Sequence, residues 1–177
     1  IELSDLDDVQ SSTVNSERYQ ATPYYFLRKP LLQIREEVKG SYFLDYGSGK
    51  GRALLLAAEL GARAVYGVDF SEKLCKICEE NLKRNGKTKN YFVECKDAVA
   101  YEPTDQINIV YLCNPFNNVI MEKILNKIKA SLDKNPRKMT IIYFNPIYES
   151  IFYGFGFQRA ARIKRRNWED EIAILRN

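Results

Sequence analysis

From residue 42 onward, short apolar runs alternate with amphipathic segments of helical length. The apolar runs predict strands, and the longer segments, with Gly or Asn-Gly at their ends, predict helices. Strands are expected at residues 42–46, 64–68, 91–95, 107–113 and 139–144, and helices at 52–60, 72–85 and 119–132. Strands that alternate with helices pair in parallel through right-handed crossovers. The alternation therefore predicts an α/β fold with a doubly wound, mostly parallel sheet.

The N-terminal part of the chain lies outside this alternation. Residues 1–16 are polar and acidic, and we interpret them as an arm. Residues 23–38 carry apolar side chains at helical spacing, interrupted by Pro30. This pattern predicts one kinked helix or two short helices.

The C-terminal part departs from the alternation in a different way. A short helix is expected at 147–153, followed by two strand-like runs, 157–164 and 171–175, with a polar turn between them. Two such runs after a parallel sheet predict an antiparallel hairpin at its edge. We therefore expect one compact unit, with an N-terminal arm and helical segment (1–40) that covers a ligand site on the main domain (41–177).

Composition narrows the possible chemistry. The 177 residues carry a net charge of +4, with 45% apolar and 28% charged residues, which are ordinary values for one globular domain. No run is long enough to span a membrane, and no secretory signal is visible. The sequence has no histidine, which excludes Ser–His and Cys–His nucleophilic chemistry.

The four cysteines predict no metal site. Cys75 and Cys78 have the spacing of a redox or zinc motif, but they fall in an expected helix, with neither a second such pair nor a histidine. We interpret them as small buried helix residues. Free thiols without a secretory signal suit the reducing cytoplasm.

The loop after the first strand is the main functional signal. It reads Asp-Tyr-Gly-Ser-Gly-Lys-Gly from Asp45 to Gly51, and a helix is expected to follow it. In an open α/β sheet, ligands bind beyond the carboxyl ends of the strands, and glycine lets the backbone approach a ligand closely. The spacing matches neither a phosphate-binding loop nor the dinucleotide fingerprint. Asp45 would repel an anion but would hold a ligand that carries an ammonium group.

Two further carboxylates follow the next two strands. Asp69 comes 22 residues after Gly47, a position from which a carboxylate accepts hydrogen bonds from ribose hydroxyls. Asp97 follows the third strand and could accept from an adenine amino group. An acidic residue after a strand often only caps the next helix, but here three meet at one sheet edge.

These motifs carry a family resemblance. The segments 45–51, 67–69, 96–98 and 113–116 resemble successive motifs of the class I, seven-stranded S-adenosylmethionine-dependent methyltransferases, over about residues 40–177. The resemblance implies S-adenosyl-L-methionine as the cofactor, S-adenosyl-L-homocysteine as the product and a seven-stranded sheet. It also implies that the cofactor's methionine, ribose and adenine parts meet these residues in chain order: Asp45, Gly47, Ser48, Gly49, Gly51, Asp69, Phe70, Asp97, Ala98 and Asn114.

A second, shorter resemblance lies near the N-terminus. The segment from Tyr19 to Pro23, Tyr-Gln-Ala-Thr-Pro, is similar to one that precedes the first helix in some seven-stranded protein-lysine methyltransferases. That similarity implies that Tyr19 and Thr22 fold over the amino-acid end of the cofactor. The alternative is that Thr22 and Pro23 simply begin a helix.

The end of the fourth strand bears on the methyl acceptor. Asn114 offers an amide oxygen and Pro115 a backbone carbonyl, both of which can accept from an amine N–H, while Phe116 can stack on a flat group. The segment resembles the Asn-Pro-Pro-Tyr/Phe box of amino-group methyltransferases, although one proline is missing. It also resembles the corresponding strand end of the lysine methyltransferases. The alternative is a strand-ending turn with a packed Phe.

The sequence therefore favours a methyltransferase that acts on nitrogen in a protein side chain or a small amine. The alternatives are methylation of nucleic-acid bases and a non-catalytic S-adenosylmethionine-binding module; an NAD-dependent oxidoreductase fits least. If the substrate were a nucleic acid, two basic clusters, within 83–89 and 159–166, would contact its phosphate backbone. Neither the acceptor nor the oligomeric state can be read from the sequence.

Overall fold

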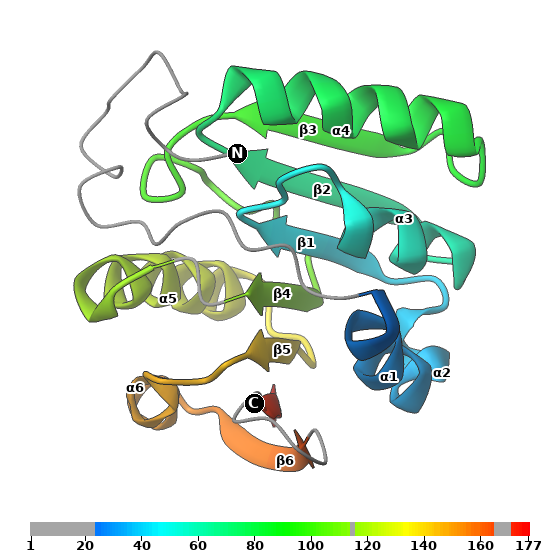
Figure 1. Cartoon of the computed structure of the whole chain (residues 1–177). Helices are drawn as coiled ribbons and strands as arrows, with labels where there is room; N and C mark the ends of the chain where they lie inside the picture. The colour runs from blue at the N-terminus through cyan, green and yellow to red at the C-terminus, as the bar shows by residue number, and fades with distance from the viewer. Residues whose placement is uncertain (1–23, 114–115, 165–170) are drawn as a thin grey trace.

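The structure, a computed structural model, describes residues 24–113, 116–164 and 171–177. These residues form a seven-stranded sheet in the order β3-β2-β1-β4-β5-β7-β6 (Figure 1). The strands are β1 (Tyr42–Tyr46), β2 (Ala64–Asp69), β3 (Tyr91–Cys95), β4 (Ile109–Cys113), β5 (Thr140–Phe144), β6 (Gln158–Lys164) and β7 (Glu171–Arg176).

Helices lie between the strands and before the first one. They are α1 (Tyr24–Gln33), α2 (Arg35–Val38), α3 (Arg52–Glu59), α4 (Glu72–Asn85), α5 (Asn118–Lys134) and α6 (Glu149–Gly154). None of the helices in the described ranges is long and apolar enough to cross a membrane.

The sheet has the predicted mixed topology. β1 to β5 run parallel to one another, whereas β7 pairs antiparallel with both β5 and β6. The hairpin is confirmed, and its second strand, β7, is the one that joins it to β5. Because the five parallel strands end on one side, the segments that follow β1, β2 and β3 meet at the same edge (Figure 1).

Two apolar cores cover the two faces of the sheet. One core joins α5, α6 and the 98–107 loop to side chains such as Leu44 and Tyr143. The other joins α1, α2, α3 and α4 to side chains such as Phe43 and Ile142. Since successive residues of a strand point to opposite faces, Phe43 and Leu44 serve different cores. The two cores hold the parallel strands, and with them the ligand edge, between helical layers.

Local signals set the helix ends. Ser71 caps α4 by accepting from the Leu74 N–H at 3.3 Å, and Gly86 ends it in a left-handed conformation. Pro30 lies inside α1, and the break between α1 and α2 falls at Ile34. The prediction of two short helices is confirmed, but the break is not at the proline.

Candidate active site

The glycine loop after β1 is held against β2. The N–H groups of Gly47 and Ser48 both donate to the Val68 carbonyl, at 2.8 and 3.0 Å. All three glycines of the loop have positive φ: 77° at Gly47, 51° at Gly49 and 80° at Gly51. Residues other than glycine rarely adopt this backbone conformation, so the loop requires glycine at these three positions.

Gly51 also makes a close approach to α4. A Cβ built on Gly51 would lie 2.6 Å from the Sγ of Cys78, which is buried in the helix. The predicted burial of Cys75 and Cys78 is confirmed, and no metal-binding cluster occurs among the described residues. Sequence reasoning missed this contact, which fixes the distance between the loop and α4.

Asp69 links the loop to the start of α4. Its Oδ2 accepts from the Gly49 N–H at 2.9 Å, and its Oδ1 accepts from the Ser71 N–H at 2.9 Å. Burial raises the pKa of Asp69, and the N–H groups of Ser71 and Gly49 partly offset the rise. Each carboxylate oxygen keeps acceptor capacity, so Asp69 can also meet ribose hydroxyls. Its role in shaping the loop was not anticipated from the sequence.

Asp45 is the most unusual group at this edge. Its side chain is only 3% exposed, and among the described residues its Oδ1 has no hydrogen-bond partner. Burial, followed by the charge of Asp69, raises its pKa from 3.8 to about 8. A buried acceptor without a donor is costly, and a bound cation or N–H donor would relieve that cost.

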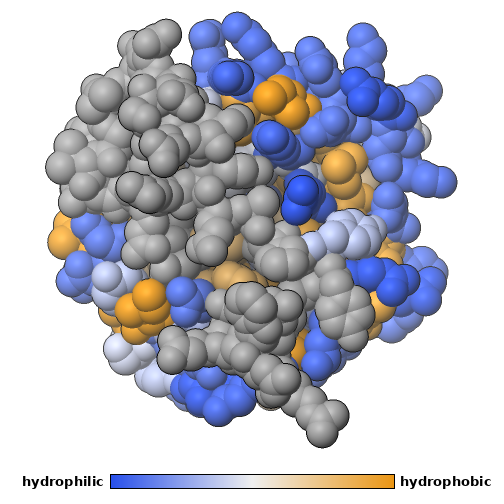
Figure 2. Space-filling model, viewed as in Figure 1, coloured by the Kyte–Doolittle hydropathy of each residue, from blue (hydrophilic) through white to orange (hydrophobic). Residues whose placement is uncertain are grey.

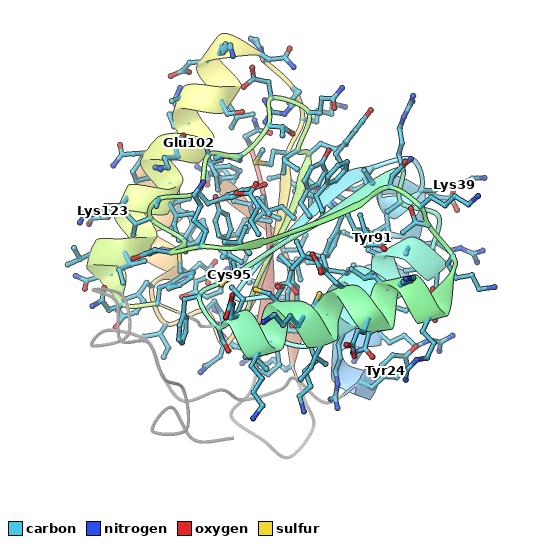
Figure 3. All side chains as sticks on the ribbon, turned by 90° about the horizontal axis from the view of Figure 1, so that it is seen from above. Tyr24, Lys39, Tyr91, Cys95, Glu102 and Lys123 are labelled. Atoms are coloured by element: carbon cyan, nitrogen blue, oxygen red, sulfur yellow. The ribbon has the colours of Figure 1, made fainter. Side chains whose placement is uncertain are left out.

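The segment after β3 completes the described part of the edge. Asp97 is half-buried, its Oδ1 accepts from the Val99 N–H at 2.9 Å, and Ala98 is buried. Phe70, half-buried after β2, accepts from the Cys95 thiol through its carbonyl at 3.5 Å. In Figure 3, Tyr91 and Cys95 mark the two ends of β3, and Cys95 lies beside the first turn of α4.

The remaining predicted site residues fall differently. Phe116 is 8% exposed and packs in the core that contains α5. Tyr19, Thr22, Asn114 and Pro115 lie outside the described residues. The structure thus brings together the glycine loop, Asp45 and Asp69, with the Asp97 segment at the same edge, and the predicted roles of the others stay predictions.

These features fit S-adenosylmethionine. The left-handed glycines open the loop, the orphaned Asp45 oxygen suits an ammonium group, and Asp69 keeps free lone pairs beside the loop. An anionic phosphate would instead face two buried carboxyl groups, Asp45 and Asp69. These carboxyl groups therefore favour a cationic nucleoside over a nucleoside phosphate as the ligand.

Comparisons with known proteins agree with this geometry. A family model described as a methyltransferase domain matches residues 43–135, more than half of the chain. A ribosomal protein L11 methyltransferase of Desulforapulum autotrophicum is 30% identical over 150 residues, which cover 82% of this chain and 48% of the relative. The chain spans about half or less of the length of the curated relatives it matches.

Solved structures share the fold. A ribosomal protein L11 methylase from Lactobacillus delbrueckii subsp. bulgaricus superposes with a TM-score of 0.66 at 19% identity, covering 91% of this chain and 81% of that one. An RNA methyltransferase from Salinibacter ruber, in complex with S-adenosyl-L-homocysteine, gives 0.63 at 14% identity, covering 88% and 92%. The family match, the sheet order and the glycine loop together place this chain in the class I S-adenosylmethionine-dependent methyltransferases.

Proposed function

We propose that this chain transfers the methyl group of S-adenosylmethionine to a nitrogen atom of a protein side chain. The observation that carries the proposal is the Oδ1 of Asp45 beside the glycine loop, which is buried and has no hydrogen-bond partner in the described part of the chain. In a family that uses a cationic cofactor, this oxygen is placed to meet its ammonium group. The nitrogen acceptor is supported by the Asn-Pro-Phe sequence that follows β4.

The bound cofactor supplies an electrophilic methyl carbon, and the chain supplies position and charge. Asp45 holds the amino-acid end of the cofactor, the glycine loop lets the backbone come close, and Asp69 accepts from the ribose. Asn114 accepts an N–H of the acceptor and so directs its lone pair. Because alignment is the main requirement for such a displacement, the lack of histidine is no obstacle.

A protein acceptor is supported by the relatives, several of which are named ribosomal protein L11 methyltransferase. L11 is therefore the first acceptor to test. Within the described part of the hairpin, two arginines of the basic cluster are paired with carboxylates, which makes them less available to a phosphate backbone. Arg159 pairs with Glu149 at 2.5 Å, and Arg162 lies 3.2 Å from Glu171 and 3.6 Å from Glu149.

Three further features belong to the proposal. We place residues 1–40 as a cover over the cofactor, since α1 and α2 pack in the same core as α3, the helix that follows the loop. Four exposed cations lie around the C-terminal end of α4, a part of the surface that is mostly hydrophilic in Figure 2: Lys83, Arg84, Lys87 and Lys89. The four cysteines are free. Free thiols fit the reducing cytoplasm.

The test is transfer of labelled methyl from S-adenosylmethionine to L11, and to protein, nucleic-acid and small-molecule fractions of a cell extract. Label in L11 or in the protein fraction supports the proposal. Label confined to nucleic acid would replace it with base methylation, and no label in any fraction would leave only a binding module. Asp45→Ala should abolish transfer, whereas Asp133→Asn, an exposed carboxyl on α5, should leave it unchanged.

Cofactor binding is tested separately by thermal unfolding. S-adenosylmethionine and S-adenosylhomocysteine should raise the melting temperature, since ligands that bind only the folded state stabilise it. NAD and ATP should leave the melting temperature unchanged. Equal stabilisation by NAD would show that the site is a general nucleotide pocket.

A further inference from the structure

Two neighbouring strands are followed in the chain by the same dipeptide. Cys113 at the end of β4 and Phe144 at the end of β5 are register partners in the parallel sheet. Each is followed in the chain by Asn-Pro, at 114–115 and at 145–146. Asn145 therefore begins the segment that leaves the sheet one strand away from the proposed acceptor end. No role for Asn145 was expected from the sequence.

The backbone of Asn145 is held in an unfavourable conformation. Its φ is 50°, and it is the one non-glycine residue at positive φ in the described ranges. A residue before proline normally adopts an extended conformation, so the left-handed region is costly here. Two hydrogen bonds maintain it: the Asn145 N–H donates to the Glu171 carbonyl on β7 at 2.8 Å, and its carbonyl accepts from the Ile147 N–H at 2.8 Å.

The side-chain amide of Asn145 is available. It is half-buried, and it makes no hydrogen bond with the residues that the structure describes. Ile147, which follows the proline, is 58% exposed, so the same segment also presents an apolar side chain at the surface. Strained residues persist where the surrounding structure fixes them, and they gather at functional sites.

We infer that Asn145 is an acceptor-binding residue: its amide oxygen accepts an N–H of the nitrogen that is methylated. This inference rests on the proposed function, and it specifies the acceptor as a group with an N–H bond to donate, a neutral amine or an amide. Holding that N–H from the end of β5 restricts the direction of the nitrogen lone pair toward the methyl carbon.

Two substitutions separate this role from a structural one. Asn145→Gly removes the amide but suits a positive φ, so its melting temperature should equal or exceed that of the wild type. Asn145→Asp keeps an acceptor oxygen and also tolerates this conformation. With labelled S-adenosylmethionine and L11 or the labelled extract fraction, kcat/KM should fall about 100-fold for Asn145→Gly and less than about 10-fold for Asn145→Asp.

Cofactor affinity, measured by titration calorimetry, should be the same for the wild type and both variants. Wild-type transfer by Asn145→Gly would overturn the inference and leave the proposed function intact. An equal loss in both variants would overturn the role of the oxygen as an acceptor. If the wild type transfers methyl to no fraction, the proposed function fails, and the inference fails with it.

Discussion

Replacing Asp45 with asparagine should stabilise the cofactor-free protein while removing cofactor binding. The carboxyl group is buried, its Oδ1 has no partner among the described residues, and its pKa is raised from 3.8 to about 8. Folding therefore takes up a proton at any pH between these two values. By linkage, the contribution of Asp45 to the free energy of unfolding is most favourable at low pH, and it is lost as the pH rises to about 8.

The magnitude follows from the width of that interval. Each pH unit between 3.8 and about 8 costs about 1.4 kcal/mol, so the full interval costs about 6 kcal/mol. Asparagine has no ionisable group and avoids this cost, although its NH₂ group could lose about 1–3 kcal/mol for want of an acceptor. That loss is independent of pH. The pH slope of the difference between the two proteins therefore isolates the ionisation of Asp45.

The assay is urea-induced unfolding of both proteins at several pH values between 5 and 8.5. The advantage of Asp45→Asn should grow by about 1.4 kcal/mol per pH unit up to pH 8 and then level off. The sequence has no histidine, so few other groups titrate in this range, and the raised pKa of Asp69 is common to both proteins. Asp97→Asn, a half-buried carboxyl at the same edge, is the matched control.

If the free energies of unfolding of the wild type and Asp45→Asn varied in parallel with pH, their difference would be constant. That result would refute this reasoning, because it would mean that Asp45 is already ionised in the folded protein. Binding gives a second measurement. Below pH 8, binding of a cationic cofactor should release a proton from Asp45, and calorimetry in two buffers with different ionisation enthalpies counts that proton. No proton release would place the ammonium group elsewhere.

Three shorter predictions concern the surroundings of the site. Gly51→Ala should lower stability by about 1–3 kcal/mol because of its φ of 80° and the 2.6 Å approach to Cys78, and adding Cys78→Ala should recover part of the loss in urea unfolding. Arg159→Ala should lower stability measurably in urea unfolding, because it removes a cation from the Glu149 side chain, which is only 7% exposed, and the effect should fade as acid protonates Glu149. A maleimide should label exposed Cys95 before buried Cys78, whose pKa burial raises, as peptide mapping would show; equal rates would contradict the buried placement.

The sheet was predictable because its parallel strands are short apolar runs, four of them largely buried, whereas the edge strand β3 is partly exposed. Apolar runs at 42–46 and 91–95 gave strand bounds that match β1 and β3. The predicted strand at 107–113 begins only at Ile109, and just before it the Asn108 side chain accepts from the Tyr42 N–H at 2.8 Å. Such a bond joins segments 66 residues apart, so no local pattern could reveal it.

The site was predictable to the extent that it depends on backbone conformation. Three glycines and Asp45 within seven residues indicate an open loop beside a carboxyl group, and the structure has both. Asp69 was expected to bind the ligand or to cap the next helix, yet it also accepts from the Gly49 N–H, which is 20 residues away. The hairpin arginines looked free in the sequence, because their partner Glu149 lies on a separate helix.

The unfavourable features of this molecule collect at one edge of the sheet. Asp45 and Asp69 are buried carboxyl groups with raised pKa values, and Asn145 is strained at the end of β5. The rest of the sheet is packed between two apolar cores, which supply the stability that such features consume. If stability alone had shaped this edge, a neutral residue at 45 and a glycine at 145 would serve better. Asp at 45 and Asn at 145 are instead the residues that the proposed site for a cationic cofactor and a nitrogen acceptor would use.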